Sequence, residues 1–265
     1  MFHGTVKHAV LRAAIAIAVF SVFMTSGAAC AHDFWVNASG PKDGIVRAEI
    51  GYGHDFPKPE PIPADRTKIF EGLQLATPNG MTPLAQIGEN YAYEGKAELK
   101  KGSFLVLGTY RPTFWSNGPD GWAQKDRTQR ADATYCEEVT MFAKTILDIE
   151  GSREADFISK PAGQRLEIVP LVHPATVRPG EKFPVRILFE GKPMKTAKLE
   201  ATFAGFSNKE YKAFVGRTDL DGVVEIIPLK AGYWFAEAEY SFAHPQKDKA
   251  DKVLLLTTLS FRIGE

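Results

Sequence analysis

Residues 44–52 read GIVRAEIGY, a stretch in which the charged Arg47 and Glu49 alternate with the apolar Ala48 and Ile50. Successive side chains of a β-strand point to opposite faces of a sheet, so this alternation is typical of a half-buried strand. The stretch runs into Gly53-His54 and then into the proline-rich residues 57–63, PKPEPIP, which cannot join a sheet. It therefore predicts a strand that is followed at once by an extended surface loop.

Similar strand patterns, separated by turns such as Asn79-Gly80, lie on both sides of this stretch. In the first half, short strands are predicted at residues 33–37, 72–77, 91–100, 103–110 and 144–150. Residues 126–142 are the one stretch predicted as a helix, although Thr134 and Thr140 weaken that pattern. Residues 111–122 are predicted as an aromatic loop, and its Phe114, Trp115 and Trp122 either cover the end of a sheet or stack on a sugar or partner.

The pattern breaks near residues 159–165, where Lys160-Pro161-Ala162-Gly163 marks a boundary. After it, seven strands are predicted with the spacing of a small sandwich, at residues 166–171, 183–189, 198–203, 212–217, 223–228, 233–242 and 253–262. The sequence thus predicts an all-β protein with two β-sandwich-like domains, residues 32–160 and 165–265.

The first 31 residues have the features of a secretory signal peptide. Lys7 and Arg12 charge its start, residues 13–24 are apolar, and Ala29-Cys30-Ala31 supplies the small residues of a cleavage site. Cleavage after Ala31 makes His32 the first residue of the mature chain. A cut before Cys30 is the alternative and gives a different terminus.

The composition of the mature chain limits the classes of partner that it can bind. The 265 residues carry 32 basic and 32 acidic side chains, and loss of Lys7 and Arg12 leaves 30 against 32. A chain without a basic excess is a poor nucleic-acid binder. No apolar run after residue 31 approaches the roughly 18 residues of a membrane span. Once Cys30 is removed, Cys136 is unpaired, and we expect it to be buried rather than a ligand.

A histidine at the mature N-terminus has two nitrogen donors on one residue. The α-amine of His32 and Nδ1 of its imidazole can close a six-membered chelate ring around one metal ion. Their unperturbed pKa values are about 7.7–8.0 and about 6.5, so a metal can displace their protons near neutral pH. Before cleavage the amine is an amide, and the chelate does not exist.

His54 is the best candidate to join His32, because it lies where a strand ends and flanking glycines let the backbone bend. Three nitrogens from two histidines suit copper or nickel. The simpler interpretation is a surface histidine in a turn. Asp33 and Asp55, which each follow a histidine, can ligate or orient an imidazole, and Asp55 can equally cap the loop.

Other candidates are weaker. His173 and His244 each precede a proline, and we expect both to be solvated in turns. Tyr135, Cys136 and Glu137 form a second small group of possible ligands. The sequence contains no G-x-S-x-G, H-E-x-x-H, phosphate-binding loop or dinucleotide fingerprint, which favours a binding protein over an enzyme.

The chain resembles a family of exported bacterial proteins described as periplasmic components of nickel uptake systems of the energy-coupling-factor type. Three matching features lie at the starts of the two halves: His32-Asp33-Phe34-Trp35, Gly53-His54, and a strand end with Pro170, Leu171 and Pro174. Four more follow in the second half, at Pro179-Gly180, residues 189–193, residues 218–222 and Gly232 to Trp234. Together they cover nearly the whole mature chain.

The resemblance implies a periplasmic protein that binds Ni²⁺, with His32 and His54 as ligands, and passes it to membrane nickel transporter components. Co²⁺ and Cu²⁺ are the alternative ions. It also implies an immunoglobulin-like or carboxypeptidase-regulatory-like second domain. Two other functions remain open: a copper enzyme that uses a terminal-histidine brace to cleave polysaccharide oxidatively, and a carbohydrate-binding or adhesion sandwich without a metal.

Overall fold

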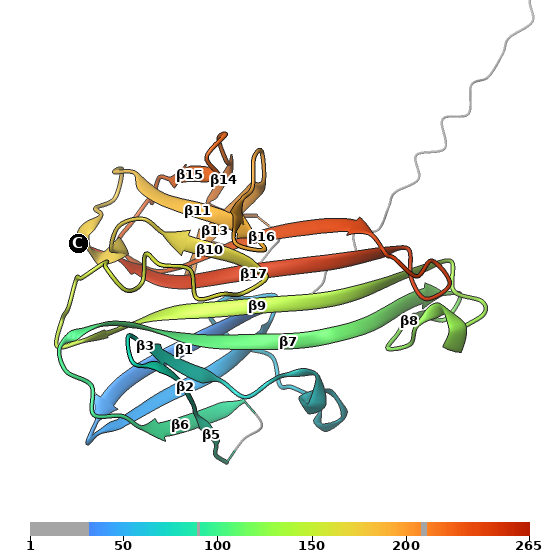
Figure 1. Ribbon diagram of the computed structural model, residues 1–265, viewed down its shortest axis with the longest axis horizontal. Coiled ribbons are helices and arrows are strands. Elements are labelled where there is room, and N and C mark those ends of the chain that lie inside the picture. Colours follow the sequence, from blue (N-terminus) through green and yellow to red (C-terminus); the bar gives the residue numbers. More distant parts are fainter. Residues whose placement is uncertain (1–31, 89–90, 208–210) are drawn as a thin grey trace, which may run out of the picture. The chain divides into compact units, whose positions relative to one another are not determined.

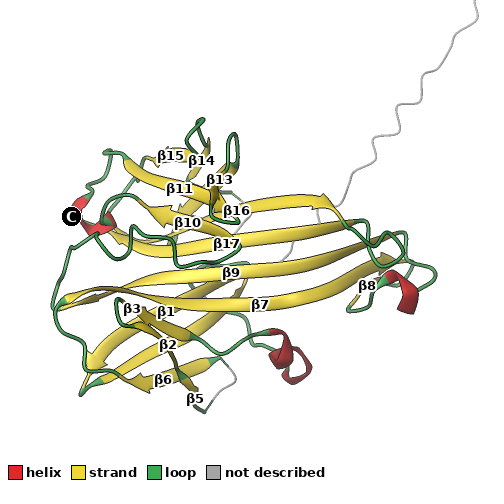
Figure 2. Ribbon diagram, viewed as in Figure 1, coloured by secondary structure: helices red, strands yellow, loops and turns green. Residues whose placement is uncertain are grey.

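The computed structural model describes residues 32–88, 91–207 and 211–265. The predicted signal peptide, residues 1–31, lies outside the described residues. The described chain consists almost entirely of strands and turns, with three short 3-10 helices (Figure 2), which confirms the all-β prediction.

The stretch at residues 44–52 forms most of one strand in a four-stranded antiparallel sheet, here the first sheet. Its strand order is β1 (Asp33–Lys42), β2 (Ile45–Gly53), β6 (Ala92–Lys96) and β5 (Ala85–Gln86). In β2, Ala48 and Ile50 are buried while Arg47 and Glu49 are exposed, as the alternation predicts.

A nine-stranded sheet forms the centre of the molecule (Figure 1). Its order is β14 (Phe214–Arg217), β13 (Lys198–Phe203), β16 (Gly232–Ala243), β17 (Lys252–Ile263), β9 (Tyr135–Ile149), β7 (Gly102–Gly118), β3 (Gln74–Thr77) and β4 (Gly80–Pro83), with β8 (Gly121–Ala123) paired to β7. The pair β17–β9 is parallel and the other pairs are antiparallel.

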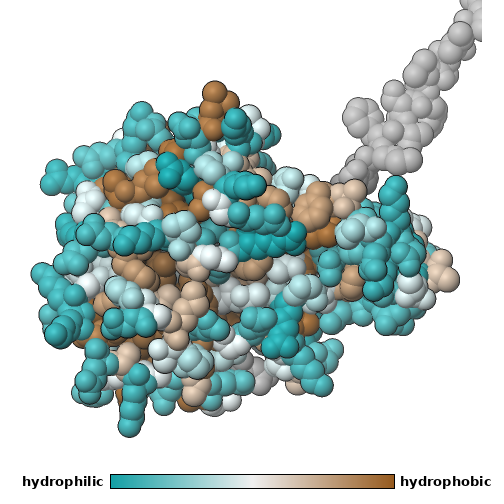
Figure 3. All heavy atoms as spheres, viewed as in Figure 1, coloured by the Kyte–Doolittle hydropathy of each residue, from teal (hydrophilic) through white to brown (hydrophobic). Residues whose placement is uncertain are grey.

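The third sheet contains β10 (Leu166–Pro170), β11 (Phe183–Phe189), β12 (Lys192–Pro193) and β15 (Val223–Ile226). The 3-10 helices are η1 (Ala64–Ile69), η2 (Arg127–Gln129) and η3 (Pro174–Thr176). None of the helices in the described ranges has the length and apolar content needed to cross a membrane. Polar side chains cover most of the face seen in Figure 3, with hydrophobic patches between them, as is normal for a protein surface.

Two hydrophobic cores lie on opposite faces of the central sheet. Along β9, Met141 and Ala143 pack into the core shared with the first sheet, whereas Phe142 packs into the core shared with the third sheet. Along β17, Leu254 and Leu255 divide in the same way. The alternation of a strand therefore lets one sheet serve both cores.

Residues 32–265 form one compact unit, and the parallel pair β9–β17 joins strands from before and after residues 159–165. All strands of the first sheet come before residues 159–165 in the sequence, and all strands of the third sheet come after them. The division into residues 32–160 and 165–265 stays a prediction.

Two local predictions are wrong. Residues 126–142 are not a helix, because only Arg127–Gln129 forms a 3-10 turn and β9 begins at Tyr135, where the chain pairs with β7 and β17. Residues 111–122 are not a loop, because β7 continues to Gly118. The register of β7 shifts between Tyr110 and Thr113, and this irregularity accommodates Pro112, which cannot donate a ladder hydrogen bond.

The aromatic side chains of that segment do not share one platform. Phe114 contacts the ring of His244, Trp115 donates a hydrogen bond to the Tyr110 hydroxyl, and Trp122 contacts Tyr135.

Candidate metal centre

The structure brings the two predicted histidines together at one end of the first sheet. His32 directly precedes β1 and His54 directly follows β2, and Asp33 is opposite Gly53 in the antiparallel register. The imidazole centroids of His32 and His54 are 4.3 Å apart, with their planes tilted by 37°. Antiparallel pairing of β1 with β2 is thus what makes two histidines 22 positions apart neighbours.

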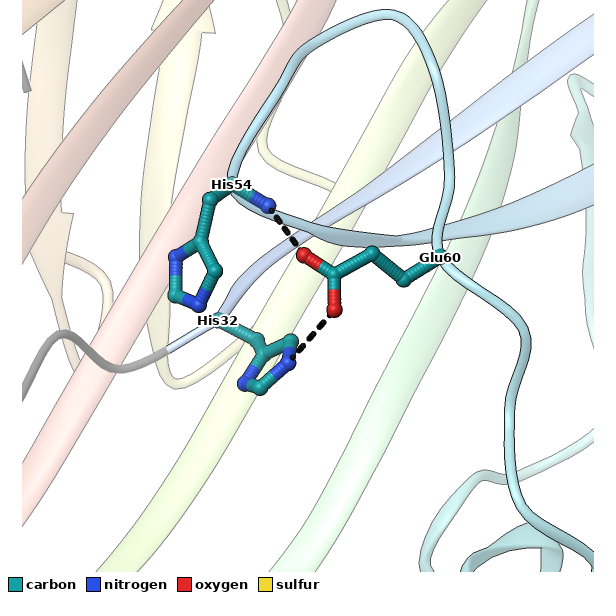
Figure 4. Close-up of side chains that lie close together, drawn as sticks. All are labelled: His32, His54 and Glu60. Carbon is teal, nitrogen blue, oxygen red and sulfur yellow. Dashed lines mark hydrogen bonds and ion pairs between the residues drawn. The ribbon is translucent and has the colours of Figure 1, made fainter. Parts of the chain in front are cut away.

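Glu60 is the third member of the site and was not predicted. Its Oε2 lies 3.1 Å from Nε2 of His32, and its Oε1 accepts a 3.2 Å hydrogen bond from the backbone N–H of His54 (Figure 4). Ligand atoms of His32, His54 and Glu60 all lie within 4.8 Å of one another. Within residues 32–88, 91–207 and 211–265, no other group of three or more histidines, cysteines or carboxylates has such spacing.

The loop that carries Glu60 is anchored to the body of the molecule by Phe56. The Phe56 side chain is 6% exposed and packs against Trp35, Tyr233 and Phe235, with ring centroids 5.6, 5.0 and 5.2 Å away. Trp35 is on β1 and the other two are on β16. Burial of this ring fixes the start of the loop on which Glu60 stands.

The backbone next to Glu60 is equally constrained. The N–H of Glu60 donates a 2.7 Å hydrogen bond to the carbonyl oxygen of Tyr52. Gly53 has φ +150°, and a Cβ there would lie 2.9 Å from Cγ of Glu60. Only glycine tolerates both that φ and that approach. The last residue of β2 therefore lets the loop fold back onto its own strand.

The surroundings of His32 favour the neutral form of its imidazole. Its side chain is 27% exposed, and burial together with the neighbouring His54 lowers the pKa of His32. Its ring also stacks on Tyr52 at 4.6 Å with an interplanar angle of 8°. A neutral imidazole presents a lone pair to a metal, which a protonated one cannot.

The contact to Glu60 suggests how the two nitrogens of His32 divide their roles. If Nε2 donates its proton to Glu60, Nδ1 is the unprotonated nitrogen, and Nδ1 is the atom that can chelate together with the α-amine. Metal-binding histidines commonly hold a carboxylate in this way through their other ring nitrogen. In this arrangement Glu60 would orient the imidazole of His32, and its carboxylate lies close enough to the ligand atoms of both histidines to be a further ligand.

The structure does not bring the other predicted site residues into this group. Asp33 lies 3.5 Å from Nζ of Lys212, and Asp55 forms a backbone bridge to Lys58 within the loop. Cys136 is fully buried on β9, as predicted, and burial raises the pKa of its thiol. The Tyr135 hydroxyl donates to Glu137, so this second group is an internal hydrogen-bonded pair.

The prediction that His173 and His244 are solvated is wrong, since they are 2% and 5% exposed. In both, Nδ1 lies within hydrogen-bond distance of the backbone N–H two residues later, across the intervening proline. The repeated His-Pro pair was the available signal, because it shapes a turn that the ring itself closes.

His173 also contacts Ser103 and Asp148, yet the three do not form a proton relay. Both partners lie on Nε2 of the imidazole, at 3.2 and 2.9 Å, while Nδ1 accepts the N–H of Ala175. A relay needs the acid and the nucleophile on different ring nitrogens. This cluster is therefore structural.

Comparison with known proteins identifies one family. A family model with the description "Domain of unknown function (DUF4198)" matches residues 29–242, a range that contains His32, His54 and Glu60. None of the curated proteins matches the sequence.

Proposed function

This chain belongs to the DUF4198 family, and from that premise we propose that it is a periplasmic protein that binds nickel and delivers it to a membrane uptake transporter. One observation carries the proposal: His32, His54 and Glu60 place their ligand atoms within 4.8 Å of one another. His32 is also the residue whose α-amine would be freed by cleavage of the signal peptide after Ala31.

Three nitrogen donors would hold the ion: the α-amine and Nδ1 of His32 and one imidazole nitrogen of His54. Such a set suits Ni²⁺ or Cu²⁺, and binding generally follows the order Co²⁺ < Ni²⁺ < Cu²⁺. Affinity alone therefore does not select nickel, and the assignment rests on the resemblance to nickel uptake components. His54 and Glu60 are exposed, which suits an ion that must be handed on.

The test is a calorimetric titration of Ni²⁺ into mature protein that starts at His32. A variant with one extra glycine before His32 keeps every side chain and loses only the terminal chelate. We expect this variant and His54→Ala to bind Ni²⁺ on the order of a thousandfold more weakly, as the loss of one donor from three implies. Lys58→Ala, an exposed change in the same loop, is the matched control.

The wild-type affinity should rise between pH 5 and pH 8, because protons compete for the amine and imidazole lone pairs. Equal affinity in the wild type and both site variants would contradict the site. A melting temperature that neither Ni²⁺ nor Cu²⁺ raises would contradict metal binding altogether, since a ligand of the folded state must stabilise it.

The same donors also occur in a copper histidine-brace enzyme, which is the second candidate. Oxidised sugar products from copper-loaded protein supplied with a reductant would favour that enzyme over a transport role.

A further inference from the structure

We propose that the metal is bound together with a small dicarboxylate anion, which Arg66 and Tyr52 hold beside the two histidines. This inference rests on the proposed function, because the ion and the anion would share one site. It names the form in which the metal is carried.

Arg66 is a cation without an anionic partner. It lies on η1, directly after the loop of Glu60, and its guanidinium stands over the ring of Trp115 at 5.4 Å from the centroid. In the part of the chain that the structure describes, no carboxylate pairs with Arg66. Glu71, five residues later, lies instead 3.7 Å from Arg111. The flat fork of an arginine matches a carboxylate with two parallel hydrogen bonds.

Tyr52 supplies the second polar group. Its side chain is 5% exposed, and its hydroxyl makes no hydrogen bond to any residue that the structure describes. A phenol hydroxyl can donate a hydrogen bond as well as accept one. By contrast, the hydroxyl of Tyr110 accepts a 2.7 Å hydrogen bond from Nε1 of Trp115. The Tyr52 hydroxyl is not among the enclosed side-chain atoms that lack a partner, so a bound ligand can reach it and accept its hydrogen bond.

These groups are neighbours of the metal centre. The Tyr52 ring stacks on His32 at 4.6 Å and on Tyr110 at 6.4 Å, and Tyr110 is bonded to Trp115, over which Arg66 stands. The guanidinium, the hydroxyl and the histidines thus border one region.

Charge balance selects the kind of anion. A divalent ion and Arg66 bring three positive charges, Glu60 removes one, and two remain. A dicarboxylate neutralises both. Its oxygens can also fill a coordination position that three nitrogen donors leave open, since nickel sites combine nitrogen with oxygen ligands.

The test uses malonate as the probe, with mature protein and a fixed concentration of free Ni²⁺. We expect saturating malonate to tighten Ni²⁺ binding about tenfold, the effect of one hydrogen bond to a charged group. Equilibrium dialysis should retain one labelled malonate per protein only when Ni²⁺ is present. Arg66→Met and Tyr52→Phe should abolish both effects while Ni²⁺ alone still binds. Arg47→Met, an exposed change on β2, is the control that should keep them.

The outcomes separate the two proposals. Ni²⁺ binding that malonate does not tighten in the wild type, or tightens equally in Arg66→Met, would overturn the anion site and leave the metal site standing. Enhancement by inorganic phosphate but not by malonate would overturn the carboxylate assignment. Absence of Ni²⁺ binding under every condition would overturn the proposed function and this inference with it.

Discussion

Lys212 lies between two carboxylates, at 3.5 Å from Oδ2 of Asp33 and 2.5 Å from Oε1 of Glu237. One cation cannot neutralise both acids. Burial, and then the neighbouring Asp33 carboxylate, raise the pKa of Glu237 to about 8, against an ordinary value of 4.5. This cluster, one residue from His32, therefore ties β1 to β16 most firmly when Glu237 is protonated.

Glu237→Gln should flatten the pH dependence of stability. The folded state keeps a proton on Glu237 between about pH 4.5 and pH 8 that the unfolded state releases. This contribution is complete below pH 4.5 and is lost as pH rises through 8. We therefore expect the melting temperature of the variant, relative to wild type, to be higher at pH 8 than at pH 5. Glu239→Gln, an exposed change two residues away, should leave that difference near zero, and a constant offset between Glu237→Gln and wild type would contradict the protonated acid.

The site residues that the sequence predicted are those whose own sequence neighbours mark them out. His32 stood out because cleavage would make it terminal, and His54 because Gly51 and Gly53 precede it at a strand end. Glu60 was missed although it is the only carboxylate within PKPEPIP. Its proximity depends on the loop returning to Tyr52, a contact that no local pattern encodes. Arg66 and Tyr52 became candidates only through what the fold leaves unpaired.

At the scale of elements, the loop of residues 54–63 decides whether the site is preformed. Its only strand-like pairing is the bridge between Asp55 and Lys58. Its four prolines, with Gly53 before its first residue, cannot position a carboxylate by themselves. The burial of Phe56 and the hydrogen bond from Glu60 to Tyr52 do so. Preorganised supports of this kind determine how precisely a site holds its ligand.

Phe56→Ala should lower both stability and metal affinity. Removal of a buried phenylalanine ring costs about 3 kcal/mol of unfolding free energy, and here it also frees the loop. We expect Ni²⁺ binding about tenfold weaker, since supporting residues typically contribute 10–100-fold. Phe189→Ala, in the core between the central and third sheets, should destabilise the protein without changing Ni²⁺ affinity. Unchanged affinity in Phe56→Ala, measured well below its melting temperature, would show that the loop is fixed by other contacts.

Strand positions were largely readable from alternation and turn residues, and β11 and β13 coincide with their predicted ranges. The prediction failed at β9, whose first residues lack alternation because both faces are buried: Glu137, Val139 and Met141 on one side, Cys136, Thr140 and Phe142 on the other. Two-sided burial erases the period-2 signal. The central place of such a strand is a property of the whole sheet and not of its sequence.

Across the whole molecule, one buried ion pair links the central sheet to the third sheet. Nζ of Lys144 on β9 lies 2.6 Å from Oε1 of Glu167 on β10, and both side chains are almost fully buried. Glu167 also accepts the backbone N–H groups of Ala162 and Gly163. The pair therefore fixes the segment that connects the two halves of the chain.

Lys144→Met should destabilise the protein by about 3–5 kcal/mol, because it leaves the Glu167 carboxylate buried without its cation. Chemical denaturation of mature protein would measure the loss. Lys182→Met, which removes an exposed ion pair with Glu225, is the control and should cost less than about 1 kcal/mol. Equal losses in the two variants would mean that the buried pair adds nothing beyond a surface contact.

β17 follows every other described strand in the sequence and yet occupies the interior of the largest sheet, with β16 on one side and β9 on the other. Synthesis from the amino end therefore produces both neighbours of β17 before β17 itself. Until β17 has been made, β9 and β16 have no partner between them, and the largest sheet remains in two parts. Its closure is thus the last pairing that the described strands can make.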